Sequence, residues 1–292
     1  MQATNTLAVK AGMHKKNVTL KIVYILIGIA LGILFLFPIL ILVLNSFKNQ
    51  KGIFLNVLGS PDAGTFTPKN YPQAFQSLNY VQSFANSLVI TVVSTLLILL
   101  VSSMAAWVLV RYKTKASSVI FILFAAAMLV PFQCVMLPLM SMGSALHMIN
   151  RVGLVIMYVG FGTSMSIIMF HGFIKNVPEE LEEAATIDGC NSVQLFFIIV
   201  VPMLKTIMIT VAILNVMWIW NDYLLPFLVI GNSDFKTLTL EIYYAKMLSG
   251  QYGNPWELIF PAVLVSIIPI IIVFLSLQKY FVKGVSDGAV KM

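Results

Sequence analysis

The sequence predicts an all-α integral membrane protein with six transmembrane helices, and two observations support this prediction. Hydrophobic residues make up 59% of the 292 residues and charged residues only 10%, whereas an average soluble domain has about 25% charged residues. The charges also separate six apolar runs, and each run has a length close to that of a membrane-crossing helix, about 20 residues. This composition excludes a soluble enzyme, a nucleic-acid-binding domain and a disordered protein.

The first three spans are predicted over residues 22–46, 86–111 and 118–142. The first lies in the charge-free stretch between Lys21 and Lys48 and is too long for the apolar region of a cleaved signal peptide, so it should remain as a true span. The second ends at the first charge that follows it. The third contains two prolines, which membrane helices tolerate where neighbouring groups satisfy the freed carbonyls.

The remaining spans are predicted over residues 152–174, 206–230 and 258–278. The fourth is bounded by charged residues on both sides, the fifth is interrupted by Asp222, and the sixth is free of charge. A polar loop over residues 175–205 separates the fourth span from the fifth.

The distribution of Lys and Arg predicts the orientation. With the N-terminus inside, twelve of the 18 Lys and Arg residues fall on inner segments and six on outer ones. Because inner loops of membrane proteins are enriched in these residues, both the N-terminal segment 1–21 and the C-terminal tail 281–292 are predicted to be cytoplasmic, in a protein of the bacterial cell membrane.

The loop between the fourth and fifth spans holds five of the eleven acidic residues. They fall within a predicted short helix, Pro178–Asp188, because proline suits the first helical position and carboxylates suit the first turns. Gly189 can adopt the left-handed conformation that ends a helix. Asn191 is predicted to cap a second helix, with Gln194 at the capping-box position.

One side of this short helix carries mostly small residues. Leu181, Ala184, Ala185 and Asp188 are spaced at i, i+3, i+4 and i+7, which places them on one face flanked by carboxylates. Two interpretations remain open on this basis: a solvated linker, or a projection that fits a socket on another protein.

The spacing within the loop resembles a family motif. Glu183-Ala184-Ala185, three residues, Gly189, nine residues and then Ile199-Val200-Val201-Pro202 resembles the EAA loop of ABC-importer permeases, with Val201 in place of leucine. The segments FTPKNYPQAF, WNDYLLPFLV and VKGVSDGAVKM resemble carbohydrate-uptake permeases, in particular the second permease subunit of maltose-type importers.

This resemblance implies the type I ABC importer permease fold, with the loop helix docked on an ATPase. Glu183 would pair with a basic residue of the ATPase, Ala184 and Ala185 would allow close approach, and Gly189 would set the turn. The residues implied to couple the chain to the ATPase are Glu183, Ala184, Ala185, Asp188, Gly189 and Pro202.

The resemblance also implies the partners. They are a homologous second permease, forming a heterodimer, two copies of an ABC ATPase that bind ATP and Mg, an extracytoplasmic solute-binding protein, a sugar and membrane lipid. The outer loop would contact the binding protein through Tyr243, Gly250, Tyr252 and Asn254. The tail would insert between the ATPase subunits as an extended chain.

Several kinds of site are not predicted. No G-x-x-x-x-G-K-[ST] motif occurs, so the chain itself should bind no ATP. The three histidines, His14, His147 and His171, lie in different segments, which argues against a metal site. We therefore expect no catalytic residues, no cofactor, no metal and no nucleic-acid partner.

The fifth span carries a polar stripe of Asn215, Trp218, Asn221 and Asp222. Amides and an indole suit the hydroxyls and ring faces of a sugar, and a carboxylate in an apolar run should face a cavity or a partner. The alternative is that Asp222 lies near the outer end of the span, within an interfacial aromatic belt.

The sequence therefore predicts half of the translocation pathway of an ATP-driven, binding-protein-dependent sugar importer. Two alternatives remain within transport: an ion-coupled secondary transporter in which Asp222 carries the coupling, and an importer permease for a solute other than a sugar. A third is a scaffold or sensor that binds a cytoplasmic partner through the acidic loop.

Overall fold

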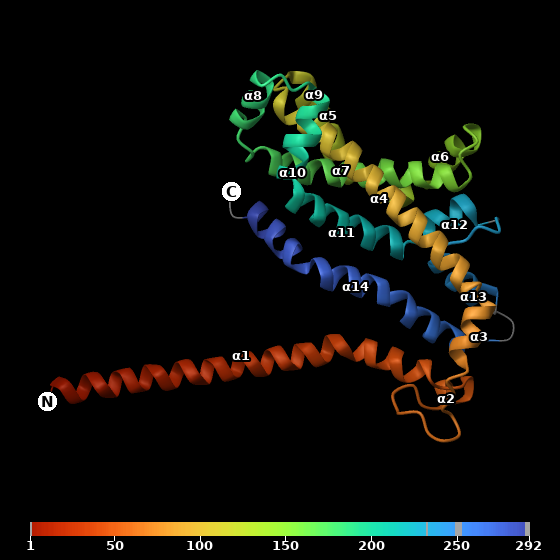
Figure 1. Ribbon diagram of the computed structural model, residues 1–292. Coiled ribbons are helices and arrows are strands. Elements are labelled where there is room, and N and C mark those ends of the chain that lie inside the picture. Colours follow the sequence, from red (N-terminus) through yellow and green to blue (C-terminus); the bar gives the residue numbers. More distant parts are fainter. Residues whose placement is uncertain (1, 232, 249–252, 290–292) are drawn as a thin grey trace. The chain divides into compact units, whose positions relative to one another are not determined.

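The computed structural model describes residues 2–231, 233–248 and 253–289, with side chains described within 20–231, 233–247 and 253–279. The described residues are mostly helical and form no β-strand, only an isolated bridge between Lys48 and Phe66. The all-α prediction is therefore confirmed. The chain divides into two compact units, residues 1–74 with 255–264, and residues 75–254 with 265–292 (Figure 1).

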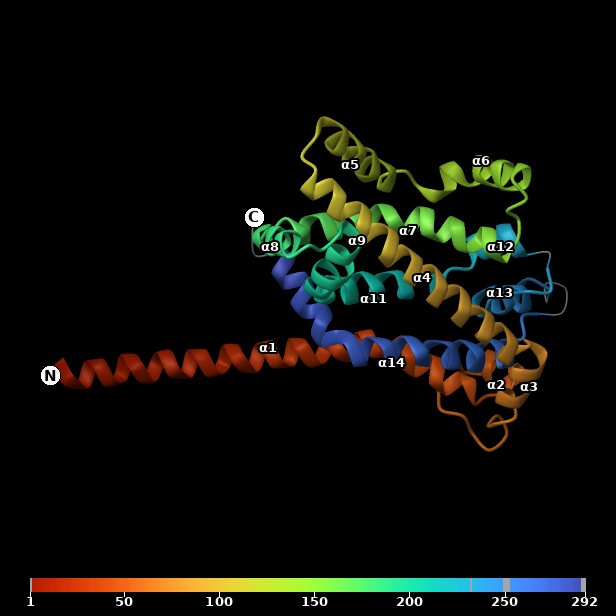
Figure 2. The ribbon, with the colours of Figure 1, turned by 45° about the horizontal axis from the view of Figure 1, so that its top comes forward.

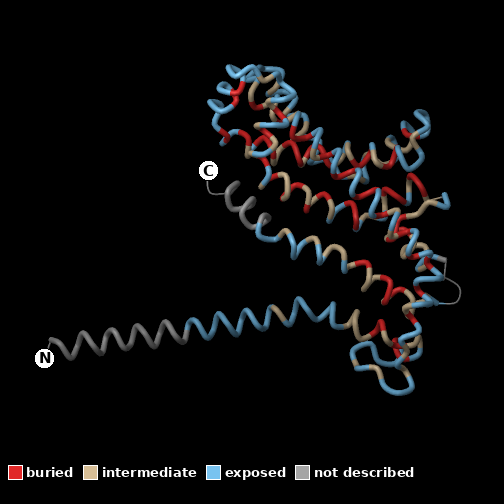
Figure 3. Tube along the Cα trace, viewed as in Figure 1, coloured by how far each residue is buried: buried red, intermediate tan, exposed pale blue. Residues whose placement is uncertain are grey.

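The first unit contains α1 (Gln2–Ser46), α2 (Gln50–Leu55), the start of α3 (Asn70–Ser77) and the first turns of α14 (Trp256–Ala289). Most of the apolar side chains between residues 20 and 40 of α1 are exposed (Figure 3), as expected of a helix surrounded by lipid. The loop after α1 is held by the buried Lys48, whose amine donates to the Asn56 carbonyl at 2.6 Å.

The second unit is built around α4 (Tyr80–Arg111), α7 (Arg151–Ile174) and α11 (Lys205–Asn221). α4 packs along α7, and α11 packs against both (Figures 1 and 2). Buried residues concentrate on these three helices (Figure 3). The packing is close at Gly162, where a Cβ atom would lie 2.5 Å from Ile98 Cδ1 and 2.7 Å from Asn215 Oδ1. A small residue at such a crossing lets membrane helices approach.

The third predicted span, 118–142, is two helices rather than one. α5 (Lys115–Met128) and α6 (Phe132–Ala145) are bent by 106° relative to each other. Pro131 caps the start of α6 in an extended conformation. Since a residue that precedes proline is driven out of the helical region, Val130 and Pro131 together end α5 and restart the chain in a new direction.

The segment around the fifth predicted span, 206–230, is also divided. α8 (Glu180–Ile187) is followed by α9 (Ser192–Gln194), the π-helix η1 (Leu195–Val200) and α10 (Val201–Met203). The run from Ser192 to Met203 meets α11 at 79°. α11 ends at Asn221, and α12 (Leu224–Ile230) begins after a two-residue break.

Four helical stretches in the described chain are long and apolar enough to cross a membrane, and the number rises to six if each of the two bent pairs counts as one span. The four stretches are Leu20–Ser46, Tyr80–Arg111, Arg151–Ile174 and Trp256–Lys279. The four stretches correspond to the predicted first, second, fourth and sixth spans, and the bent pair of α5 and α6 to the third. The second bent pair, Ser192–Met203 with Lys205–Asn221, begins before the predicted fifth span, 206–230, and ends within it.

Two other segments differ from the sequence-based expectation. The predicted outer loop between the fifth and sixth spans contains a helix, α13 (Leu238–Leu248). The tail was expected to be extended, but α14 continues to Ala289, so residues 281–289 are helical. The sequence has no proline after Pro269, and the glycines of the tail lower helix propensity without preventing the helix. Residues 290–292 lie outside the described chain.

Candidate functional site

The end of α8 and the start of α9 have the conformations that the local sequence predicts. Gly189 has a φ of +90° directly after α8, the left-handed conformation predicted for it. Asn191 Oδ1 accepts from the Gln194 amide at 2.9 Å, and Gln194 Oε1 accepts from the Asn191 amide at 3.0 Å. The predicted capping box is thus confirmed. α8 itself begins at Glu180, two residues after the predicted start.

Gly189→Ala tests the backbone requirement alone. A Cβ atom at this position would meet no other atom within 4 Å, so the substitution adds no clash. The left-handed conformation costs an L-residue about 1–2 kcal/mol. We expect the free energy of unfolding to fall by about that amount in chemical denaturation. An unchanged stability would show that the turn can relax to a negative φ.

Glu182 fastens α8 to the end of α4. Its side chain is buried, with 7% of the residue exposed. Arg111 donates to Glu182 Oε1 from Nε at 2.9 Å and from Nη2 at 2.6 Å, and the Trp107 indole donates to Oε2 at 2.9 Å. Both carboxylate oxygens are therefore bound by donors one turn apart on α4. Arg111 Nη2 also donates to the Val177 carbonyl at 3.2 Å, which holds the segment that leads into α8.

We call Trp107, Arg111 and Glu182 the α8 anchor. Charge-assisted hydrogen bonds of this kind are strong, and removal of one partner from a buried ion pair costs about 3–5 kcal/mol because the other charge is left uncompensated. The Trp107 ring also contacts the ring of Phe196 on η1, with centroids 5.6 Å apart. Phe196 belongs to a buried cluster with Phe170 on α7. A displacement of α8 would therefore disturb α4 and that cluster together.

A second ion pair lies beside the α8 anchor, and unlike the anchor it is exposed. Lys113 Nζ donates to Glu179 Oε1 at 3.0 Å, and the same oxygen lies 3.7 Å from Arg111 Nη1. The hydrogen bond from Lys113 lowers the pKa of the Glu179 carboxyl. Both Lys113 and Glu179 are exposed, and exposed pairs contribute little to stability.

Most residues of the predicted face of α8 are exposed, but one of them is buried against the rest of the chain. Glu183, Ala184 and Asp188 are exposed, and so is Leu181 at 49%. Ala185 is buried, with 8% exposed, because it shares the inward side of α8 with Glu182. It is therefore not part of the exposed face that the spacing suggested. Ile187, at 85% exposed, adds an apolar side chain at the end of this surface, and Pro202 is exposed on α10.

Sequence reasoning missed the α8 anchor. It treated the carboxylates of the loop as a group that favours a helix start, although Glu182 alone is buried. A signal was present in the spacing. Trp107 and Arg111 are spaced at i and i+4 at the end of a span, and Glu182 and Ala185 are spaced at i and i+3 on the same side of α8.

The polar stripe that was predicted to contact a sugar also contains both buried and exposed residues. Asn215 is buried, and its Nδ2 donates to Ser166 Oγ at 3.1 Å and to the Val211 carbonyl at 2.9 Å. It joins α11 to α7 within the chain. Trp218 and Asn221 are exposed, so these two remain candidates for contact with a solute.

Asp222 lies between helices rather than within one. Its Oδ1 accepts from the Leu224 amide at 2.9 Å, and its Oδ2 accepts from the hydroxyl of the buried Tyr158 at 3.0 Å. The Thr239 hydroxyl donates to the Asp222 carbonyl at 2.8 Å. Asp222 therefore binds the first amide of α12 and connects the break between α11 and α12 to α7 and α13.

The expected contacts with a binding protein are only partly described. Tyr243 lies on α13 and is partly buried, with its ring stacked on that of Tyr223 at a centroid distance of 4.8 Å. Asn254 is partly buried. Gly250 and Tyr252 lie outside the described residues. Among the described residues, no cluster of histidine, cysteine and carboxylate side chains could hold a metal ion.

The apolar helices indicate a multi-pass helical membrane protein, and α8 is anchored to one of them, α4. A family model described as the binding-protein-dependent transport system inner membrane component matches residues 98–287, which is more than half of the chain. The chain belongs to this family. Its members are transport components, so the prediction that the chain is not an enzyme is confirmed.

Individual relatives agree with this assignment. A probable permease protein of a starch degradation products transport system from Thermoanaerobacterium thermosulfurigenes is 41% identical over 91% of this chain and 95% of that protein. A permease protein of a multiple sugar-binding transport system from Streptococcus mutans is 36% identical over 92% and 96%.

One solved structure resembles the fold of the chain. It is a bacterial ABC transporter involved in the import of the acidic polysaccharide alginate, one chain of which matches 88% of this chain and 94% of its own length, with a TM-score of 0.72 and 22% identity. At that identity the likeness concerns the fold alone.

Proposed function

We propose that this chain forms half of the translocation pathway of an ATP-driven importer for a sugar or oligosaccharide. It would pair with a homologous second permease in a heterodimer, with two copies of an ATPase that bind ATP and Mg, and with an extracytoplasmic binding protein. The single observation that carries the coupling part of this proposal is α8: its exposed face is formed by Glu183, Ala184 and Asp188, while Glu182 fixes its other side to α4.

This arrangement suits the transmission of a movement. A short helix that is exposed on one side and held by a buried ion pair on the other can be pushed as a rigid body, and the push reaches α4 through the α8 anchor. Docking of α8 on the ATPase is therefore proposed to convert ATP-driven closure into rearrangement of the spans. A solvated linker would not need a buried anchor.

The proposal that the transported solute is a sugar is based on the names of related proteins. The two relatives reported above are named for starch degradation products and for multiple sugars, and others in the same comparison are named for melibiose, raffinose and stachyose and for arabinooligosaccharides. Within this chain, exposed Trp218 and Asn221 would offer an apolar ring and an amide to a sugar. Ion coupling through Asp222 is disfavoured, because its two carboxylate oxygens already accept hydrogen bonds within the chain.

The proposal is tested by transport into proteoliposomes that contain the complete complex and its binding protein. We expect accumulation of at least one sugar among starch-derived, raffinose-type and arabinose-containing oligosaccharides, dependent on ATP and Mg. Accumulation driven by a proton or sodium gradient in the absence of ATP would overturn it. ATP-dependent uptake of a solute that is not a sugar would support the importer assignment but overturn the assignment of a sugar as its substrate.

The orientation of the chain is tested separately. We expect Lys246→Cys on α13 to react with a membrane-impermeant thiol reagent added outside intact cells, and Lys205→Cys at the start of α11 to react only after permeabilisation. Both lysines are exposed. The background would carry Cys134→Ser and Cys190→Ser, which removes the two native thiols. The opposite labelling pattern would invert the topology and with it the role of α8.

A further inference from the structure

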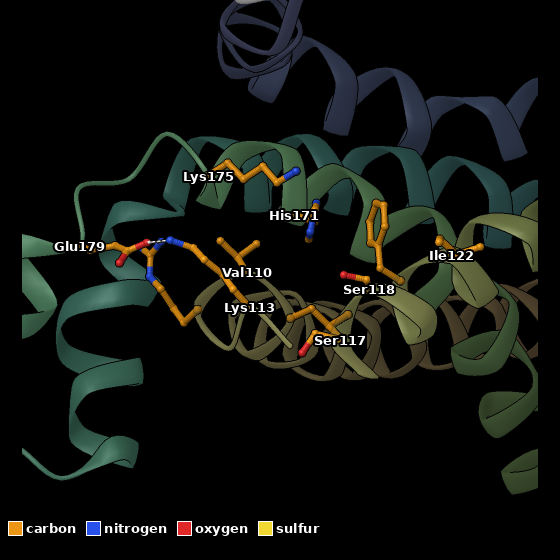
Figure 4. Close-up of a pocket in the computed structure, with 11 residues that line it drawn as sticks. Val110, Lys113, Ser117, Ser118, Ile122, His171, Lys175 and Glu179 are labelled. Carbon is orange, nitrogen blue, oxygen red and sulfur yellow. Dashed lines mark hydrogen bonds and ion pairs between the residues drawn. The ribbon is translucent and has the colours of Figure 1, made fainter. Parts of the chain in front are cut away.

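A cavity of about 620 Å³ lies in the second unit, where α4 ends, α5 begins and α7 ends (Figure 4). Its volume is within the about 300–1,000 Å³ typical of small-molecule sites. The polar side chains around it are Arg111, Lys113, Ser117, Ser118, Lys175 and Glu179, and His171 forms part of the wall. The family comparisons and the proposed transport function assign no role to this cavity.

The cavity has an excess of positive charge. Three cationic side chains line it against a single carboxylate. Glu179 is paired with Lys113 at 3.0 Å, and Arg111 is bound by Glu182. Lys175 is exposed, and its side chain makes no hydrogen bond or ion pair with any residue that the structure describes. Its positive charge is therefore available to an anion.

A hydroxyl group at the start of α5 adds a donor on the opposite wall. Thr114 caps α5, a 14-residue helix, by accepting from the Ser117 amide at 3.1 Å. Its hydroxyl also lies 3.0 Å from Ser117 Oγ and can donate to it, which leaves the Ser117 proton for a ligand, whereas the Ser118 hydroxyl donates to the Thr114 carbonyl at 3.3 Å. Figure 4 shows the Lys175 amine extending toward the His171 ring, across the hollow from these two serines. An amine and a hydroxyl are groups that bind phosphate oxygens.

The remaining wall points to a lipid rather than a soluble anion. Ile122 lines the cavity and is also 62% exposed, and the neighbouring Val119, Ile120 and Leu123 of α5 are exposed apolar residues. The polar hollow therefore opens onto an apolar surface suited to acyl chains. Arg111, Lys113, Lys115 and Lys175 gather at this end of the helices, the side that the positive-inside rule assigns to the cytoplasm.

We propose that this cavity binds the phosphate of an anionic phospholipid, with Lys175 as the principal cation, Ser117 as a hydroxyl donor, and an acyl chain along Ile122. Basic pockets between membrane helices on the cytoplasmic side are suited to such headgroups. The bound lipid would rest against the start of α5 and the end of α7, next to the segment that leads into α8.

The test is the lipid retained by the purified full-length protein after reconstitution into vesicles with equal amounts of phosphatidylglycerol and phosphatidylcholine. We expect enrichment of phosphatidylglycerol in native mass spectra. Lys175→Gln should lower the ratio of bound phosphatidylglycerol to phosphatidylcholine about fivefold, the effect of one basic residue near a charged membrane surface. Lys175→Arg should retain the ratio, since it keeps the charge.

Lys205→Gln is the matched control, because Lys205 is an exposed lysine of the basic end that does not line the cavity. An equal decrease in the Lys175 and Lys205 variants would overturn the site in favour of a general attraction. Saturable binding of inorganic phosphate in phosphatidylcholine vesicles, lost in Lys175→Gln, without preference for phosphatidylglycerol, would overturn the lipid as the source. These readouts need no transport activity, so they are independent of the proposed function.

Discussion

Glu182→Ala should abolish ATP-driven uptake while the protein remains in the membrane. The substitution leaves the Arg111 guanidinium and the Trp107 indole without their shared acceptor. A buried charge left without its partner costs about 3–5 kcal/mol, which is enough to release α8 from its fixed position. We expect the uptake rate to fall more than about tenfold, since each 1.4 kcal/mol corresponds to a factor of ten. The measurement is uptake per amount of membrane-inserted protein, alongside the ATPase rate of the complex.

Two further variants separate coupling from folding. Glu180→Gln removes a carboxylate from the same helix at an exposed position, so it should transport at the wild-type rate. The double variant Arg111→Met with Glu182→Met removes both charges at once. Because apolar replacement of a whole buried ion pair is often neutral or stabilising, it should recover uptake relative to Glu182→Ala. Wild-type uptake in Glu182→Ala would show that the α8 anchor has no part in transport.

The features that sequence predicts well are those decided within a few residues. The positive φ of Gly189 and the reciprocal hydrogen bonds of Asn191 and Gln194 depend on backbone geometry over a single turn. The apolar spans are likewise predicted from a local property, because a run of apolar residues only has to be as long as the membrane core is thick. None of these features requires knowledge of which helices are neighbours.

The features that sequence missed depend on distant parts of the chain. Glu182 and Glu183 are adjacent and chemically identical, yet only Glu182 is buried, because its partner Arg111 lies 71 positions earlier. Asn215 belongs to the predicted polar stripe but is directed at Ser166 on α7. Periodicity identifies a helical face, but it does not state what lies opposite that face.

The bend between α5 and α6 shows a further limit. The sequence shows that Pro131 interrupts an apolar run, and residues 118–142 were predicted to form one span. The observed angle of 106° requires that the backbone leave the helical region over several residues, which the proline and its predecessor make possible but do not dictate. Phe132, Leu139 and Met140 of α6 pack against the buried cluster that contains Met157 and Tyr158 of α7, and the sequence does not reveal these contacts.

Glu183→Lys should also eliminate uptake, for a reason outside the chain. Glu183 is exposed, and its side chain makes no hydrogen bond or ion pair with any residue in the described part of the chain. Its replacement should therefore leave the free energy of unfolding and the α8 anchor unchanged. If Glu183 meets a basic residue of the ATPase, the reversal places two like charges together in an interface, which costs several kcal/mol. Uptake and the rate of ATP hydrolysis by the complex should then fall together, more than about tenfold.

Glu180→Lys provides the matched control, since it makes the same change of charge on the same exposed helix. If only the net charge of α8 matters, the two variants should lose uptake equally. If Glu183 faces a particular cation, only Glu183→Lys should fail, and reversal of that cation on the ATPase should restore uptake. Glu182→Ala is expected to break the connection between α8 and the spans, whereas Glu183→Lys is expected to break the connection between α8 and the ATPase. A complex that assembles normally in the first case and weakly in the second would distinguish the two sides of the helix, because only the exposed side is proposed to meet the ATPase.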